Sequence, residues 1–161
     1  MAVHSVRMVA DRRCVVLLKE PERERYFAIS IGLAEAVAIA AANQPVPRPL
    51  THDLLRTIVE QLGATVTHIL VHDKKDGVYY ARIVLDVQGR YAEVDSRPSD
   101  AIALAVRLQL PILVEEAILS EDAITPENEE VDDTPRVTEE DLGVFRDVIK
   151  GLDLDDLGRK S

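Results

Sequence analysis

The pattern of apolar and polar positions predicts a chain that mixes strands and helices. Apolar residues largely alternate with polar ones, as in half-buried strands, at residues 3–9, 26–31, 65–72, 78–87 and 91–95, and short continuous apolar runs at 14–18 and 112–114 indicate two further strands. Helical spacing recurs at residues 33–42, at 51–62 and after Pro98. Asp76 and Gly77 form a hairpin turn signal, which indicates antiparallel pairing. The pattern therefore predicts an α+β fold, with a mostly antiparallel sheet and about three packed helices.

The chain also repeats itself weakly at an offset of 65 residues. Residues 26–44 align with residues 91–109, and Glu35 falls opposite Asp100. Each half follows the order strand, strand, strand, helix. This order favours an internal duplication, in which the two acids occupy the first turns of equivalent helices. The alternative is that both acids are there because a helix dipole favours an anion in its first turn.

The apolar stripe of the helix at 51–62 is predicted to face the core. Its members are Leu54, Leu55, Ile58, Val59 and Leu62. The other two predicted helices are rich in alanine and apolar on all sides. Because such helices leave apolar surface to cover, they favour a homodimer.

Composition and charge divide the chain into a core and an acidic tail. The 161 residues suit one domain with an extension, and 47% hydrophobic residues can bury a core. Residues 1–114 have 14 Lys/Arg and 13 Asp/Glu, whereas residues 115–161 have 5 and 16. We therefore expect an α+β domain at 1–119, an acidic disordered linker at 120–138, and a C-terminal helix and tail at 139–161. The nearly neutral core does not indicate tight binding through many phosphate contacts.

The cysteine content and the N-terminal segment favour a cytoplasmic protein. The single cysteine, Cys14, excludes an internal disulfide and is expected to be a buried, inert thiol. Arginines interrupt the N-terminal segment before the apolar core of a signal peptide could form. No apolar run approaches the roughly 20 residues of a membrane span, so no membrane partner is expected.

A dense polar cluster lies where a strand passes into the helix after Pro98. It contains Asp95, Arg97, Ser99 and Asp100. Closely placed carboxylates can hold a divalent cation, and an arginine can neutralise charge that develops on a phosphate during hydrolysis. The alternative is structural: Asp95 or Ser96 caps the helix, and Arg97 pairs with Asp100 or with another chain.

A second candidate, His52 beside Asp53, starts the helix at 51–62. A histidine there could act as a general base that an aspartate orients. However, adjacent helical residues point about 100° apart, so these two side chains need not touch. The alternative is a Thr51 cap, an exposed histidine and an aspartate that interacts with the helix dipole. The sequence contains no Gly-rich phosphate loop, HExxH or paired CxxC motif.

Three stretches together resemble one known family. They are RPLTHDLL at 48–55, DGVYYARI at 76–83, and DSRPSDAIALAVR with the following PI at 95–107 and 111–112. They resemble the bifunctional nuclease domain family of bacteria and plants, over about residues 3–119. The resemblance implies a compact α+β domain that forms a homodimer and hydrolyses both DNA and RNA.

The resemblance marks five residues by motif position, while the roles of these and of the remaining residues are assigned from the chemistry of their side chains. Five are expected to be catalytic, namely His52, Asp53, Arg97, Ser99 and Asp100. Three arginines are expected to bind substrate, namely Arg48, Arg82 and Arg97. Two carboxylates are expected to hold Mg²⁺ or Mn²⁺, namely Asp95 and Asp100. The predicted function is a metal-dependent nuclease of low sequence specificity; the alternative is a non-catalytic dimeric binding or regulatory module that uses the SRPSD segment as an interface or anion site.

Overall fold

Two sheets form the framework of the domain. The computed structural model describes residues 1–9 and 13–125. The predicted linker from residue 126 on and the whole predicted C-terminal segment at 139–161 lie outside these ranges. The first sheet has the order β1 (Ala2–Met8), β2 (Cys14–Lys19) and β3 (Tyr26–Ile31), and it is antiparallel throughout. The second has the order β6 (Arg90–Ser96), β5 (Val78–Val87), β4 (Ala64–Lys75) and β7 (Ile112–Val114). Among the described strands, only β7 pairs in parallel, with β4.

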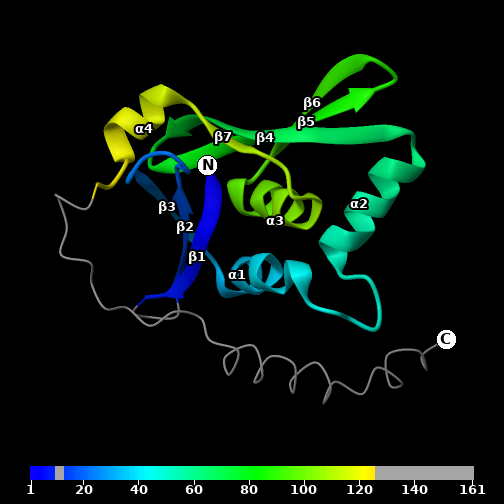
Figure 1. Cartoon of the computed structure of the whole chain (residues 1–161), viewed down its shortest axis with the longest axis horizontal. Helices are drawn as coiled ribbons and strands as arrows, with labels where there is room; N and C mark the ends of the chain where they lie inside the picture. The colour runs from blue at the N-terminus through cyan, green and yellow to red at the C-terminus, as the bar shows by residue number, and fades with distance from the viewer. Residues whose placement is uncertain (10–12, 126–161) are drawn as a thin grey trace.

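The helices connect and cover these sheets. They are α1 (Leu33–Ala40), extended by the 3-10 helix η2 (Ala41–Asn43), then α2 (Thr51–Gln61), α3 (Pro98–Leu108) and α4 (Glu116–Asp122). In Figure 1, α3 lies between β4 above and α1 below, and α2 stands at the right of the molecule. The α+β prediction is confirmed, with two sheets in place of one. The order strand, strand, strand, helix recurs as β1-β2-β3-α1 and β4-β5-β6-α3, while a common origin of the two units stays a hypothesis.

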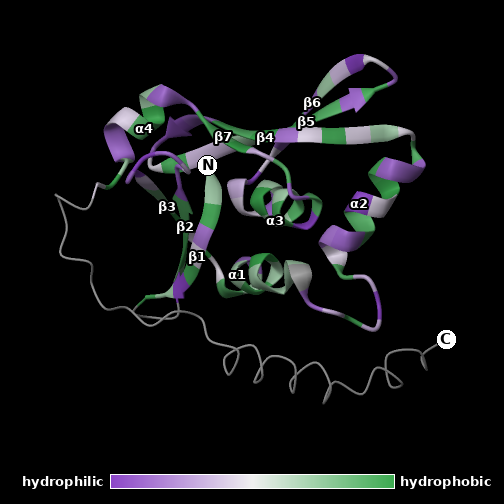
Figure 2. Ribbon diagram, viewed as in Figure 1, coloured by the Kyte–Doolittle hydropathy of each residue, from purple (hydrophilic) through white to green (hydrophobic). Residues whose placement is uncertain are grey.

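The core is aliphatic and is centred on α3. Eight of the eleven residues of α3 are buried, and Ile102 and Leu104 are fully buried. They pack with Phe27 and Ile69 from the two sheets. Cys14 is also fully buried, as predicted, and burial raises the pKa of its thiol. Figure 2 shows the hydrophobic colouring concentrated on α1, α3 and the strands around them.

The predicted orientation of α2 is wrong for every member of its apolar stripe except Val59, which packs against the core. None of its residues is buried, and the stripe expected to face the core is largely open to solvent, with Leu54 53% and Leu62 76% exposed. Leu55 and Ile58 are exposed as well. The half-buried side of α2 is instead largely polar, and it consists of His52, Asp53, Arg56 and Val59. This side faces inward because His52 and Asp53 bind two charged residues of α3, Asp100 and Arg107.

Regular structure continues past residue 119, the domain boundary expected from composition. Helix α4 continues through Asp122, and Ile124 pairs with Tyr26 in an isolated antiparallel bridge. Of the residues expected to begin the linker, 120–122 complete α4 and 123–125 lie half-buried after it. In the part of the chain that the structure describes, no helix is both long and apolar enough to cross a membrane.

Candidate active site at the first turns of three helices

Each of the three central helices carries an acid at its third position. The N-cap residues of α1, α2 and α3 are Gly32, Leu50 and Arg97, so the acids at position N3 are Glu35, Asp53 and Asp100. A carboxylate at N3 is favourable because it can accept free backbone N–H groups and interacts with the positive end of the helix dipole. Helix α3 packs against both α1 and α2, so the three acids belong to one group of helices.

Arg97 links two of these acids. Its Nε lies 2.7 Å from Asp100 Oδ2, and its Nη1 lies 2.9 Å from Glu35 Oε1. The Glu35 carboxylate folds back over Gly32, where an added Cβ would collide with Glu35 Oε2. The hydrogen bonds to Asp100 and then to Glu35 raise the pKa of the guanidinium, and the Arg97 side chain is 65% exposed. A permanent positive charge therefore stands at the open end of α3.

His52 reaches the same carboxylate from α2. Its Nε2 lies 3.2 Å from Asp100 Oδ1, and its side chain is only 14% exposed. The expected alternative of an exposed histidine is therefore wrong. Burial raises the pKa of Asp100, but the hydrogen bonds with Arg97 and His52 more than offset it, so the pKa lies below its ordinary value. Asp100 is thus a carboxylate at neutral pH, bonded to a histidine and an arginine at once.

Asp53 has a different set of partners from His52. Its Oδ2 accepts the backbone N–H of Leu50 at 2.9 Å, and its Oδ1 lies 2.7 Å from Nε of Arg107. Burial raises the pKa of Asp53, whereas these two contacts lower it to below the ordinary value. The N-cap of α2 is Leu50, so the expected Thr51 cap is wrong. The neighbours His52 and Asp53 thus serve separate networks.

The structural alternative for the SRPSD segment is partly confirmed. Arg97 pairs with Asp100, and Pro98 occupies the first position of α3. The N-cap is Arg97 itself, so neither Asp95 nor Ser96 caps the helix. Ser99 is buried at the second position of α3. The segment is therefore both a helix start and a charged cluster.

The predicted metal pair is not brought together in this arrangement. Asp95 is exposed on β6 opposite Arg82, and it alternates with Val94, which pairs with the core residue Ile83. Because side chains alternate along a strand, Asp95 points away from the face on which α3 packs. Both oxygens of Asp100 are already bonded to Arg97 and His52. Within residues 1–9 and 13–125, no group of three or more His, Cys, Asp or Glu side chains is placed to hold a metal ion. The donor set does not fit the expected ion as it stands.

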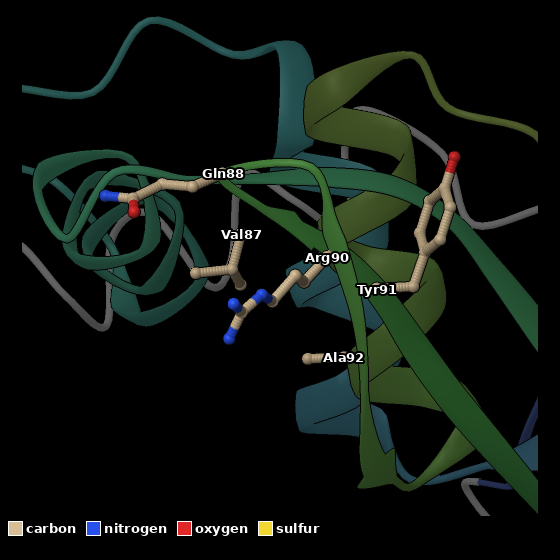
Figure 3. Close-up of a pocket in the computed structure, with 5 residues that line it drawn as sticks. All are labelled: Val87, Gln88, Arg90, Tyr91 and Ala92. Atoms are coloured by element: carbon tan, nitrogen blue, oxygen red, sulfur yellow. The ribbon is translucent and has the colours of Figure 1, made fainter.

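The predicted substrate-binding arginines are spread over the surface. Arg48 is exposed in the connector that leads into α2. Arg82 lies on the outer face of β5, where its Nη1 is 2.7 Å from Glu93 Oε2. A pocket of about 470 Å³ lies at the β5–β6 hairpin, and Arg90 and Tyr91 project to opposite sides of the strand there (Figure 3). The predicted site residues do not line this pocket, so it lies apart from the cluster on α3.

Comparison with known proteins places the chain in a family. Residues 16–127 match the family described as the bifunctional nuclease domain. The chain belongs to the bifunctional nuclease domain family. It is 38% identical over 145 residues to an uncharacterized protein of Mycobacterium tuberculosis, with 88% of this chain and 87% of that protein covered.

Plant members of the bifunctional nuclease domain family are longer. The chain is 28% identical over 114 residues to bifunctional nuclease 1 of Oryza sativa subsp. japonica, with 68% of this chain and 34% of that protein covered. It is 30% identical over 120 residues to bifunctional nuclease 2 of Arabidopsis thaliana, with 71% and 36% covered. The chain therefore spans about a third of these plant relatives, and the resemblance noted in the sequence is confirmed.

Two residues that contact the candidate site residues of this bifunctional nuclease domain, Glu35 and Arg107, were not predicted from the sequence as site residues. Glu35 was noted only through the internal repeat, which placed it opposite Asp100. Arg107 had one signal, because it is the single charged residue in the apolar run after Asp100. A lone arginine within a buried helix requires an acidic partner, but the sequence does not reveal which acid supplies it.

Proposed function

We propose that this chain is a nuclease that hydrolyses phosphodiester bonds in DNA and RNA with low sequence specificity. The observation that carries the proposal is the chain of contacts from His52 through Asp100 to Arg97 at the solvent-exposed start of α3. Family membership supports it, because plant relatives are named bifunctional nucleases. The cluster places a guanidinium that can bind an anionic substrate close to a histidine that can act as a general base.

Each member of the cluster has a proposed role. Arg97 binds a phosphate oxygen, since its guanidinium is exposed and forms strong charge-assisted hydrogen bonds with anions. His52 shares Nε2 with Asp100, so the other ring nitrogen can take a proton from the attacking water. Asp100 keeps the imidazole oriented, and Glu35 holds Arg97 in place. Asp53 has a positioning role, because both of its oxygens are already bonded.

The predicted metal requirement and the predicted roles of Ser99, Arg48 and Arg82 stay predictions, and each has a simple test. A requirement for Mg²⁺ or Mn²⁺ is tested by cleavage with either ion and with EDTA. A catalytic role of Ser99 predicts that Ser99→Ala lowers the rate of cleavage. Substrate binding by Arg48 and Arg82 predicts that their replacement by methionine raises KM and weakens the salt dependence of binding by about one phosphate contact each.

The deciding experiment compares two isosteric changes of an aspartate. Asp100→Asn removes the charge that orients His52, and we expect the rate of plasmid and RNA cleavage to fall by about 10²-fold or more. Asp76→Asn is the matched control, because Asp76 is an exposed turn residue with a positive φ that asparagine tolerates well. Equal cleavage by both variants would assign the activity to another site or to a contaminant.

One observation favours a second function, a non-catalytic binding or regulatory module. Both oxygens of Asp100 are already bonded, to His52 and to Arg97, so this carboxylate has no oxygen free to hold a metal ion for hydrolysis. Such a module would bind nucleic acid or a small anion without cleaving it. Binding that is lost in Arg97→Met, with no cleavage by the unmodified chain under any metal condition, would establish this second function in place of the first.

We also propose a homodimer in which a second copy covers α2 and the edge strand β6. The exposed Leu54 and Ile58 lie on α2, the exposed Leu62 is its C-cap, and Tyr91 is 76% exposed on β6. Strand β6 is at the edge of its sheet, where free backbone groups can pair with another chain. The double variant Ile58→Lys, Leu62→Lys should then sediment as a 17.9 kDa monomer. Val78→Lys, an exposed apolar site at the other end of β5, should stay dimeric, and a monomeric unmodified chain would refute the dimer.

A cytoplasmic location belongs to the same set of proposals. Its support is the single, fully buried Cys14, which fits a reducing compartment. Fractionation of the source cells with an antibody to the chain tests it, and recovery outside the cytoplasmic fraction would refute it.

A further inference from the structure

Arg107 is the most deeply buried charged residue among those that the structure describes. Its side chain is 2% exposed, in the last turn of α3. It follows Asp100 by seven residues, which is about two helical turns, so the two residues lie on the same face of α3. A charge in such a place is expensive unless it is paired and fully hydrogen-bonded. Its partners therefore indicate why it is there.

Three partners accept hydrogen bonds from Arg107, and each lies on a different helix. Its Nε donates to Oδ1 of Asp53 on α2 at 2.7 Å. Its Nη1 donates to the backbone oxygens of Ala38 on α1 and Ala103 on α3, both at 2.8 Å. Its Nη2 is buried and has no partner among the described residues. One guanidinium thus joins all three helices that carry the proposed site.

The contacts of Arg107 lie close in sequence to the proposed site residues. Asp53 is adjacent to His52, and Ala38 is three residues after Glu35 on α1. The geometry points to Arg107 as a positioning residue: it fixes the first turn of α2 so that His52 reaches Asp100, and it fixes α1 so that Glu35 reaches Arg97. Its effect on cleavage rests on the proposed function, whereas its effect on the His52–Asp100 contact does not.

The shape of the guanidinium suits this role. Arginine presents donors in a fixed planar fork, so one side chain can hold acceptors in several directions at set angles. Lysine would keep the charge and the ion pair with Asp53, but its single ammonium cannot reproduce the fork. Arg107→Lys therefore separates charge from geometry. A purely stabilising role would lower the stability of the domain without affecting the contact between His52 and Asp100.

A double-mutant cycle in denaturant unfolding distinguishes these roles. The single variants His52→Ala and Asp100→Asn and their double variant are measured with Arg107 present and again in an Arg107→Lys background. We expect non-additive effects with Arg107 and additive effects with Arg107→Lys. The matched control background is Arg25→Lys, since Arg25 also bonds two acids, Glu20 and Glu116, but away from the site. Non-additivity should persist there.

Cleavage supplies a second readout. Arg107→Lys should lower kcat at least tenfold, and it should have no further effect in the His52→Ala background, because the two residues act through one contact. If Arg107→Lys does not fold, Asp53→Asn takes its place, since it removes the ion pair and keeps an oxygen for the N–H of Leu50. Non-additivity that survives in the tested background would overturn the inference. An unmodified chain that cleaves nothing would overturn the proposed function alone, and the unfolding cycle would still decide the role of Arg107.

Discussion

Helices α2 and α3 have the same length and carry an acid at the same position, yet α3 is mostly buried and α2 is not. Each has 11 residues and an acid at its third position. Eight residues of α3 are buried, whereas α2 has none. Helix α3 lies between the second sheet and α1, while α2 contacts the molecule through one polar side (Figure 1). The comparison shows that an apolar stripe alone does not decide which side of a helix faces inward.

Polar contacts explain the orientation of α2. Its inward side carries His52 and Asp53, which bind Asp100 and Arg107 on α3. If α2 turned its leucines inward, Asp100 would lose its contact with His52 and the buried Arg107 would lose its acidic partner Asp53. An unpaired buried charge costs more than an exposed leucine. The apolar stripe is therefore left on the surface, where a second copy of the chain can cover it.

The largest effect on stability is expected when one leucine in each helix is replaced by alanine and the two losses are compared. Leu104→Ala on α3 should lower the free energy of unfolding by about 2–5 kcal/mol, because it leaves a cavity in a fully packed core. Leu54→Ala on α2 should change it by about 0.5 kcal/mol or less in the monomer. Urea unfolding at low protein concentration measures both. Equal losses would mean that α2 is packed as tightly as α3.

A smaller, pH-dependent effect is expected at the base of α2. Asp53→Asn should lower the free energy of unfolding by about 2 kcal/mol at pH 7, the usual range for a hydrogen bond to a charged group. The pKa of Asp53 is lower in the folded chain than its ordinary 3.8. Its contribution is therefore complete above that value and is lost as the pH falls from 3.8 toward the folded pKa.

Urea unfolding between pH 7 and pH 2 tests this dependence. The difference between the unmodified chain and Asp53→Asn should shrink across the acidic end of the series. Asp76→Asn serves as the control, because it makes the same chemical change in an exposed turn. A difference that stays constant down to pH 2 would show that the ion pair with Arg107 does not stabilise the fold.

The smallest effect on stability is expected at the exposed end of α3. Arg97→Met removes ion pairs that lie at the surface, so the free energy of unfolding should change by about 1 kcal/mol or less. Its binding of nucleic acid should weaken, and the slope of log affinity against log salt should fall by about one contact. A large loss of stability with unchanged binding would assign Arg97 to the fold rather than to the site.

Much of the fold could be predicted from the sequence because its signals are local. Alternation predicted the strands, and Pro98 marked the start of α3. The inward side of α2 could not be predicted, because Leu54 and Leu62 satisfy the rule for a buried stripe, and only the charges on α3 reverse it. For the site, the motif identified His52 and Asp100. The contact of Arg107 with Asp53 joins residues 54 positions apart, so only the folded chain reveals it.

The N-cap residues of α1 and α3 give the internal repeat a further meaning. Gly32 and Arg97 stand at corresponding positions, 65 residues apart, and each precedes an acid by three residues. Glycine leaves room for the Glu35 carboxylate and offers it no local partner, so Glu35 turns to the arginine of the other unit. The difference at this pair of positions leaves the Glu35 carboxylate without a cation in its own first turn and puts a guanidinium at the start of α3. The ion pair between Glu35 and Arg97 therefore joins the two units, and it forms because their N-cap residues differ.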